Sequence, residues 1–204
     1  MRQLTFFAPV IAMLMISCSP ISKKDAELQI AANTATTQHM SEDKFWELID
    51  KSIMESNNNY QVQVVSLKQI LAGLAPAEII QFNNTFNALM GAAYDYKLWG
   101  AAYVINGGCS DDDFEYFRQY LVAHGKDKFY QTLKDPESCA SWMKTEEDDN
   151  WEGILYAAAG AYKIKTGQEM PKIDQPKYEL KGQAFDEDTV EQQYPVLAKK
   201  FEDE

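Results

Sequence analysis

The sequence predicts an all-α protein: a signal peptide and a flexible tether, then one compact multi-helix domain of about six to eight helices. Two observations support this fold class. From Ser41 onward the apolar residues recur at helical spacing, and no segment shows the alternating pattern of a strand. The chain is 46% hydrophobic and 12% aromatic, which is typical of a folded domain rather than a disordered chain.

The first seventeen residues, 1–17, are expected to be a signal peptide. Met1-Arg2-Gln3 is positively charged, and the apolar stretch Leu4 to Ile16 is too short for a bilayer core, which needs about 20 residues. The stretch ends in Met15-Ile16-Ser17-Cys18, which resembles the bacterial lipobox. That resemblance implies cleavage before Cys18 and a lipid on its thiol. A plain cleaved signal or an uncleaved anchor are the alternatives.

Residues 18–39 are expected to be the lipidated cysteine and a tether, because they are rich in small polar residues and have no apolar face. Two or three acyl chains on Cys18 would attach the protein stably to a membrane. Ser19, rather than an aspartate, follows Cys18. By resemblance to enteric lipoproteins, this favours the outer membrane of the cell envelope, with either face left open.

Four helices are expected in the first half of the domain, residues 40–204. Their apolar stripes are Phe45, Trp46, Ile49 and Ile53; Val64, Leu67, Ile70, Leu71 and Leu74; Ile79, Phe82, Phe86, Leu89 and Met90; and the apolar residues of Tyr96 to Ile105. Ser41 can cap the first helix, and Pro76 suits the first position of the third. The first helix is expected to end at Asn57-Asn58-Asn59 and the fourth at Asn106-Gly107-Gly108.

The second half is expected to begin with a helix that Ser110 and Asp113 cap and that stops at Gly125. A short helix follows near Phe129 to Leu133. The acidic run Glu146 to Asp149 is expected to open a long helix that ends at Gly167. After Pro171 the chain becomes irregular, and Asp186 to Lys200 is expected to form one or two closing helices broken at Pro195.

Two stretches resemble a known family. They are Phe45-Trp46-Glu47-Leu48-Ile49 and the run from Tyr96 to Arg118, YKLWGAAYVINGGCSDDDFEYFR. With Gly125, Asp135-Pro136 and Tyr194-Pro195-Val196-Leu197, the chain is similar to the bacterial domain of unknown function 4240 from Ser41 to about Phe201. The resemblance implies a helical fold and carries no activity, cofactor or catalytic residue. The export signal and Cys139 depart from the family pattern.

Seven residues form the candidate polar cluster of the domain. They are Asp95, Trp99, Ser110, Asp111, Asp112, Asp113 and Arg118. Adjacent carboxylates can hold a divalent cation, but the calcium-loop spacing is absent, and no metal is expected. The alternative is that Ser110 and Asp113 cap the helix while Asp111 and Asp112 complement its positive end.

Arg118 is the only arginine that remains after signal removal. A lone arginine among lysines suggests a position that needs a planar, forked donor. We expect a bidentate pair with an acid such as Asp95, Asp111 or Asp112, and the alternative is a site for an anion or carboxylate ligand. The aromatic residues around Trp99 are expected to be core, with the mouth of a pocket as the alternative.

Cys109 and Cys139 are the two cysteines that remain beside Cys18, in what should be an oxidising compartment. A disulfide between them is one possibility, and the alternative is two free thiols, with Cys139 as a small buried apolar residue. His39 and His124 are too few for a metal set. There is no triad order, phosphate-binding glycine loop or zinc-type cysteine spacing, and no cofactor is expected.

The formal charge of −12 becomes −13 once Arg2 is removed with the signal. This charge argues against nucleic acid or anionic lipid headgroups as partners. The sequence therefore predicts a membrane-anchored lipoprotein whose helical domain binds an unidentified protein partner or small ligand. The alternative is a carboxylate-based enzyme that acts on an envelope or polar small-molecule substrate with the candidate acids and Arg118.

Overall fold

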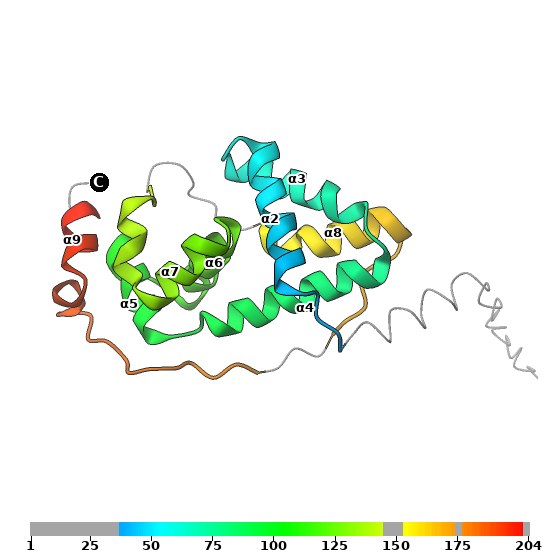
Figure 1. Cartoon of the computed structure of the whole chain (residues 1–204). Coiled ribbons are helices and arrows are strands. Elements are labelled where there is room, and N and C mark those ends of the chain that lie inside the picture. Colours follow the sequence, from blue (N-terminus) through cyan, green and yellow to red (C-terminus); the bar gives the residue numbers. More distant parts are fainter. Residues whose placement is uncertain (1–36, 145–152, 174–176, 202–204) are drawn as a thin grey trace, which may run out of the picture.

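The part of the domain that the structure describes contains eight α-helices and two short 3-10 helices (Figure 1). The computed structural model describes residues 37–144, 153–173 and 177–201. Within these ranges the elements are α2 (Glu42–Ser56), α3 (Tyr60–Ala72), α4 (Pro76–Ala92), α5 (Tyr96–Asn106), α6 (Asp111–Ala123), α7 (Lys126–Lys134), η1 (Pro136–Ser141), α8 (Ile154–Thr166), η2 (Val190–Gln193) and α9 (Pro195–Phe201). No strand occurs there apart from one isolated bridge, so the predicted all-α class is confirmed.

The predicted helix starts are confirmed by the caps. Ser41 accepts a hydrogen bond from the backbone N–H of Lys44 at 3.4 Å. Pro76 is the first residue of α4. At this position a backbone N–H would have no intrahelical partner, so proline loses no hydrogen bond there. Ser110 and Asp113 form the expected capping box at the start of α6.

Two elements differ from the prediction. α8 begins at Ile154 and not within the acidic run Glu146 to Asp149, because Gly153 has φ 149°, which no helix continues through. The run itself lies outside the described residues. The 3-10 helix η1 was not predicted; Asp135 caps it through the N–H of Glu137, and Pro136 is its first residue.

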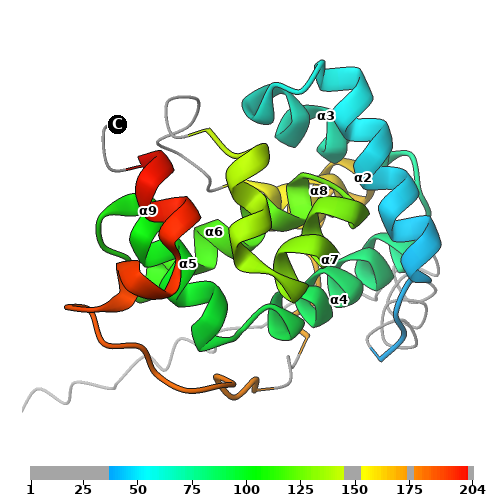
Figure 2. The same ribbon diagram turned by 60° about the vertical axis from the view of Figure 1, so that its left-hand side comes forward.

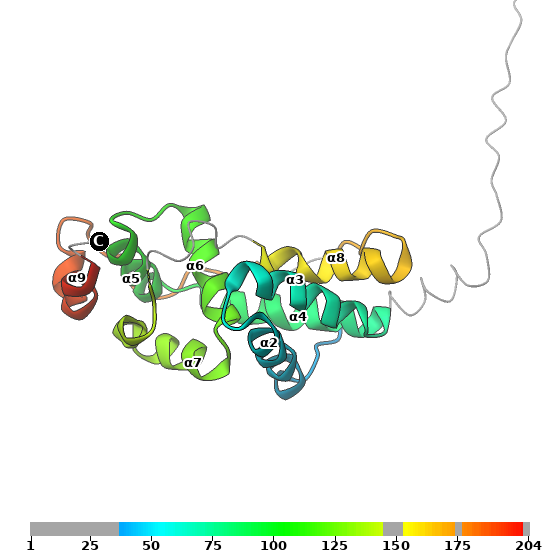
Figure 3. The ribbon, with the colours of Figure 1, turned by 90° about the horizontal axis from the view of Figure 1, so that it is seen from above.

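The helices form one elongated body (Figures 1 and 3). α2, α3 and α8 lie at one end and α5 and α9 at the other. α4 runs from the first end, beside α8, toward the middle, and α6 lies between the two ends. α3 packs against α2 and α8, α4 against α8 and α6, and α9 against α5. Stacking of Phe45 on Phe82, with ring centres 4.6 Å apart, joins α2 to α4 in the core. α6 is therefore central, and its two ends reach different surroundings.

The chain returns along the molecule before α9. Residues 177–185, here the C-terminal segment, run in extended form past α4 to α5 (Figure 2). Lys181 pairs through its backbone with Tyr94 and Tyr96, at 3.2 and 2.9 Å. The Tyr178 ring lies on Gly91, where a Cβ atom would overlap it. This segment therefore brings a late part of the sequence to the start of α5.

No helix among residues 37–144, 153–173 and 177–201 is long and apolar enough to cross a membrane.

Candidate functional site

A hollow of about 320 Å³ lies beside the first half of α6. We call it the Arg118 hollow. Its lining residues are Tyr94, Trp99, Asp111, Asp112, Phe114, Glu115, Arg118 and Tyr178. Four of the seven residues in the predicted cluster, Trp99, Asp111, Asp112 and Arg118, therefore meet at one cavity.

Helical spacing explains why α6 supplies most of the lining. Asp111, Phe114, Glu115 and Arg118 are three, four and seven residues apart, so they lie on one face of the helix. Phe114 is fully buried at the base, whereas Asp111 and Asp112 are exposed at the rim. The acids at the start of α6 also complement the positive end of its dipole.

Four aromatic rings form a stack, and three of them, Tyr94, Trp99 and Phe114, line the hollow. Trp99 lies on Phe114 with ring centres 4.9 Å apart and planes 12° apart. Tyr96 continues the stack beyond Trp99, and Tyr94 lies on the other side of Phe114 at 6.0 Å. The indole N–H of Trp99 donates to the Cys109 carbonyl at 3.0 Å and so fixes the ring. The hollow thus has a wide, ordered aromatic wall.

Arg118 lies against this stack. The central carbon of its guanidinium is 4.8 Å from the Tyr94 ring centre and 4.9 Å from that of Phe114. Its Nη1 donates to the Met90 carbonyl at 2.9 Å, and its Nε donates to the Phe114 carbonyl at 3.3 Å. Burial lowers the pKa of Arg118, and the nearby Glu115 acts in the opposite direction.

The expected bidentate pair between Arg118 and an acid is wrong for the described residues. None of the ion pairs among them includes Arg118. Carbonyl groups at the end of α4 and within α6 take its donors instead, because they are within reach of a side chain that leaves the middle of α6. The alternative, a site for an anion or carboxylate ligand at Arg118, stays a prediction.

Asp95 does not line the hollow. Its carboxylate accepts the N–H of Lys97 at 2.8 Å and caps α5. It also lies close to Gly182 in the C-terminal segment. Asp95 is therefore a structural residue at the junction of α5 and that segment.

Ser110 and Asp113 also stay outside the lining. The Ser110 hydroxyl and backbone N–H donate to the Asp113 carboxylate at 2.7 and 3.0 Å. These two hydrogen bonds lower the pKa of Asp113. The capping interpretation is confirmed for this pair, while Asp111 and Asp112 remain candidates for ligand contact.

Cys109 and Cys139 are free thiols in the structure, so the disulfide alternative is not realised. Cys139 is fully buried in η1, and its Sγ donates to the Pro136 carbonyl at 3.0 Å. Cys109 lies in the loop between α5 and α6. Burial raises the pKa of both thiols to about 12, so neither is a reactive thiolate at neutral pH.

No group of three or more histidine, cysteine or acidic side chains could hold a metal ion within the described ranges. The three acids of the Arg118 hollow are spread along α6 rather than converging on one point. Cys18, the predicted lipidation site, lies outside the described residues.

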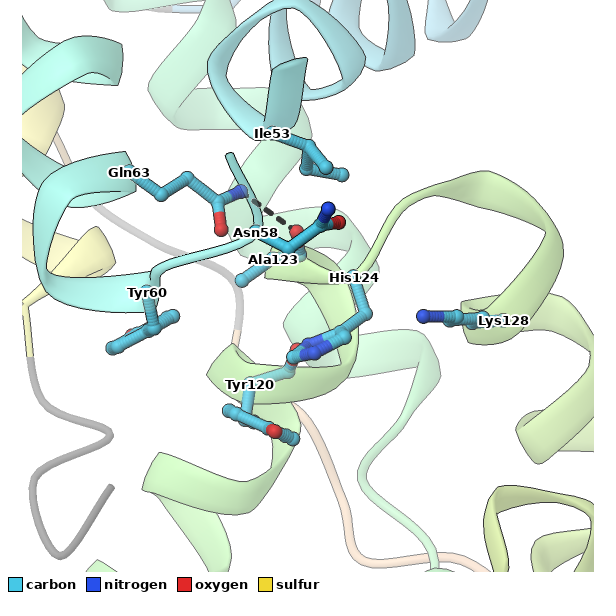
Figure 4. Close-up of a pocket in the computed structure, with 8 residues that line it drawn as sticks. All are labelled: Ile53, Asn58, Tyr60, Gln63, Tyr120, Ala123, His124 and Lys128. Atoms are coloured by element: carbon cyan, nitrogen blue, oxygen red, sulfur yellow. Dashed lines mark hydrogen bonds between the residues drawn. The ribbon is translucent and has the colours of Figure 1, made fainter. Parts of the chain in front are cut away.

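A second, smaller pocket of about 40 Å³ lies at the other end of α6 (Figure 4). We call it the His124 pocket. Its lining residues are Ile53, Asn58, Tyr60, Gln63, Tyr120, Ala123, His124 and Lys128. The amide of Gln63 donates to the Ala123 carbonyl at 2.7 Å, and Lys128 points toward the pocket from α7. His124 Nδ1 is 2.9 Å from the Tyr120 carbonyl.

Sequence reasoning missed Tyr178 and the lining role of Tyr94. The positions of Phe114 and Glu115 could be read from their helical spacing to Arg118. Tyr178 gave no such signal, because it lies in an irregular segment far along the chain and meets α4 only in the folded protein. Tyr103, one helical turn after Trp99, does not line the hollow, and its hydroxyl donates to Glu187 at 3.0 Å.

Comparisons with known proteins identify the family but no activity. No curated protein and no solved structure gave a significant match to the chain. Residues 40–164 match the family described as "Protein of unknown function (DUF4240)". This match covers more than half of the sequence and includes every residue of the Arg118 hollow except Tyr178. The chain therefore belongs to the DUF4240 family.

Proposed function

We propose that this protein is a lipid-anchored binding module of the bacterial cell envelope and that its helical domain takes a small ligand in the Arg118 hollow. The observation that carries the proposal is the convergence of Trp99, Asp111, Asp112 and Arg118 on one cavity. An aromatic wall with a few polar groups is the usual composition of a ligand site.

The anchoring part rests on the amino terminus. Met15-Ile16-Ser17-Cys18 has the lipobox pattern, and a polar stretch follows it. Lipid on Cys18 would hold the domain at a membrane, with residues 18–39 as the spacer. Ser19 after the cysteine supports the outer membrane.

Binding is favoured over catalysis by the way Arg118 is held. Its guanidinium is fixed by two carbonyls and two rings, which suits recognition of a charged group. An enzyme that uses Asp111, Asp112 or Glu115 is the alternative. It predicts turnover of the bound molecule and complete loss of turnover in Asp112→Asn with unchanged stability. Ligand recovered chemically unchanged supports the binding module.

The anchoring proposal is tested on full-length protein purified from membranes in mild detergent. Intact-mass analysis should show loss of residues 1–17 and added acyl chains, and Cys18→Ala should remove the acyl mass. Cys109→Ala is the matched control and should keep it. A mature chain without acyl mass would overturn the anchoring part and leave the ligand site to be tested separately.

A further inference from the structure

We propose that the ligand of the Arg118 hollow is an α-amino acid, held by its carboxylate at Arg118 and by its ammonium group at the acids of α6. This inference rests on the proposed function, because it names the ligand class of the same site.

Arg118 supplies the contact for a carboxylate. A guanidinium has five N–H donors. Nε and Nη1 donate to the carbonyls of Phe114 and Met90, whereas Nη2 donates to no described residue. These two bonds and the Tyr94 and Phe114 rings fix the plane of the group. A half-buried cation with remaining donors and no acid within 4.0 Å among the described residues is suited to a carboxylate ligand.

The acids supply the contact for an ammonium group. Asp111, Asp112 and Glu115 line the same hollow. Glu115 and Arg118 are separated by about 4.5 Å along the axis of α6, so one small molecule can contact both. A simple anion would be repelled by three carboxylates, and a simple cation would be repelled by Arg118. A ligand that carries both charges satisfies both sides of the hollow.

The aromatic wall supplies the contact for a side chain. Tyr94 and Trp99 are partly exposed and stack on the buried Phe114, and Tyr178 adds an exposed ring from the C-terminal segment. The volume of about 320 Å³ is near the lower end of the range for ligand sites, which begins at about 300 Å³. The hollow therefore suits a single amino acid better than a long peptide or an oligosaccharide.

The first experiment measures the melting temperature of the full-length protein in detergent with each of the twenty common amino acids. For the amino acid that stabilises most, isothermal titration then compares it with two matched analogues, the amine without the carboxylate and the acid without the amine. We expect both analogues to bind at least about tenfold more weakly, because each leaves one charged group of the site unpaired.

Two variants assign the two contacts. Arg118→Lys should weaken binding of the amino acid much more than binding of the amine analogue, because the carboxylate contact is the only ligand contact that the substitution removes. Glu115→Gln should weaken the amine analogue and the amino acid and leave the acid analogue no weaker. Glu191→Gln removes one acid from η2, which does not line the hollow, and should change none of the three affinities. A purely structural Arg118 would lower the melting temperature without this selective pattern.

The outcomes separate this inference from the proposed function. If no amino acid binds, or if the amine analogue binds as tightly as the amino acid, the zwitterion class is wrong, while a binding site for another ligand remains. If an amino acid binds with the same affinity in both Arg118→Lys and Tyr178→Ala, the ligand lies elsewhere. That result would overturn the assignment of the hollow as well as the ligand class.

Discussion

The two ends of α6 face two cavities of different size and charge. The Arg118 hollow, beside the first half of the helix, has about 320 Å³ and is lined by three acids, one arginine and four aromatic rings. The His124 pocket, at the end of the helix, has about 40 Å³ and includes His124 and Lys128 (Figure 4). Both cavities contain charged side chains, but only the first has room for more than water-sized molecules.

The dipole of α6 accounts for the charged side chain at the His124 pocket, but it accounts for only some of those at the Arg118 hollow. Lys128 lies near the negative end of α6, and its amine is 4.9 Å from the Trp142 ring centre. The His124 ring packs against both Tyr120 and Trp142, with ring centres 4.1 and 4.8 Å away. These contacts explain the positions of Lys128 and His124 without a ligand. At the other end the dipole accounts for Asp111 and Asp112 but not for Arg118, which is in the middle of the helix.

The largest expected effect is at the His124 pocket. Gln63→Leu removes the donor to the Ala123 carbonyl and to the Ser52 hydroxyl, both inside the protein. We expect the free energy of unfolding to fall by about 2–3 kcal/mol, because a buried acceptor loses its partner. Denaturant unfolding measures this change. Gln69→Leu, exposed on the same helix, is the control and should change stability little. An equal effect of the two substitutions would contradict the structural role of the pocket.

Arg118→Lys should have the next largest effect. A lysine cannot donate to the Met90 and Phe114 carbonyls in the same geometry or cover both rings, so we expect a loss of about 2 kcal/mol. The melting temperature and denaturant midpoint measure it. Unchanged stability would mean that the carbonyl contacts contribute nothing, and Arg118 would then be held mainly for a ligand.

Gln119→Leu tests the middle of α6 and should stabilise the protein. Gln119 is fully buried, and neither amide atom has a hydrogen-bond partner among the described residues. Replacing an unpaired buried amide by a leucine of similar size should raise the free energy of unfolding by about 1 kcal/mol. A lower stability would show that the amide has a partner, such as a buried water, which the leucine displaces.

Ser110→Ala tests the cap at the positive end of α6. Loss of the cap should cost about 1 kcal/mol at neutral pH. Hydrogen bonds from Ser110 lower the pKa of Asp113 below its ordinary value of 3.8, so their contribution is present above that value and is lost as the pH falls through the lowered pKa. The difference in free energy of unfolding between the wild type and Ser110→Ala should therefore narrow as the pH falls from 7 to 2. The part that remains in acid is the bond from the Asp113 N–H to the Ser110 hydroxyl.

Ser41→Ala is the matched control for that pH dependence. Ser41 caps α2 through the N–H of Lys44, with no acid at the third helical position. The loss in free energy of unfolding caused by Ser41→Ala should be similar to that caused by Ser110→Ala at neutral pH, and it should change little as the pH falls. Parallel pH profiles for the two variants would contradict the contribution of Asp113.

The smallest effect on stability is expected for Gly91→Ala. Alanine favours a helix over glycine by about 1 kcal/mol, but its Cβ would overlap the Tyr178 ring and displace it, so the two effects offset. Hydrogen exchange at Lys181, whose N–H donates to the Tyr94 carbonyl, should become faster as the C-terminal segment loosens. Gly160→Ala is the control, because its Cβ meets only the flexible side chain of Lys68. Equal exchange in both variants would argue that the contact of Tyr178 with Gly91 does not hold the C-terminal segment against α4.

Most of the fold could be predicted from local sequence. Ser41, Pro76 and the Ser110–Asp113 pair act within one helical turn, so the helix starts follow from neighbouring residues. The start of α8 could not be predicted in this way, because the acidic run looked like a first turn while Gly153 breaks the helix. The break depends on a backbone conformation that glycine permits but does not require.

The sequence by itself determined the all-α class, the family and one face of the candidate site, because the spacing of Asp111, Phe114, Glu115 and Arg118 along a helix is a local property. Only the tertiary structure decided the partners of Arg118 and the rest of the lining. Met90 of α4 accepts a hydrogen bond from Arg118, and Tyr178 of the C-terminal segment lines the hollow from its place on Gly91. Both positions depend on how the helices pack. Contacts between distant segments follow from packing, which no local pattern encodes.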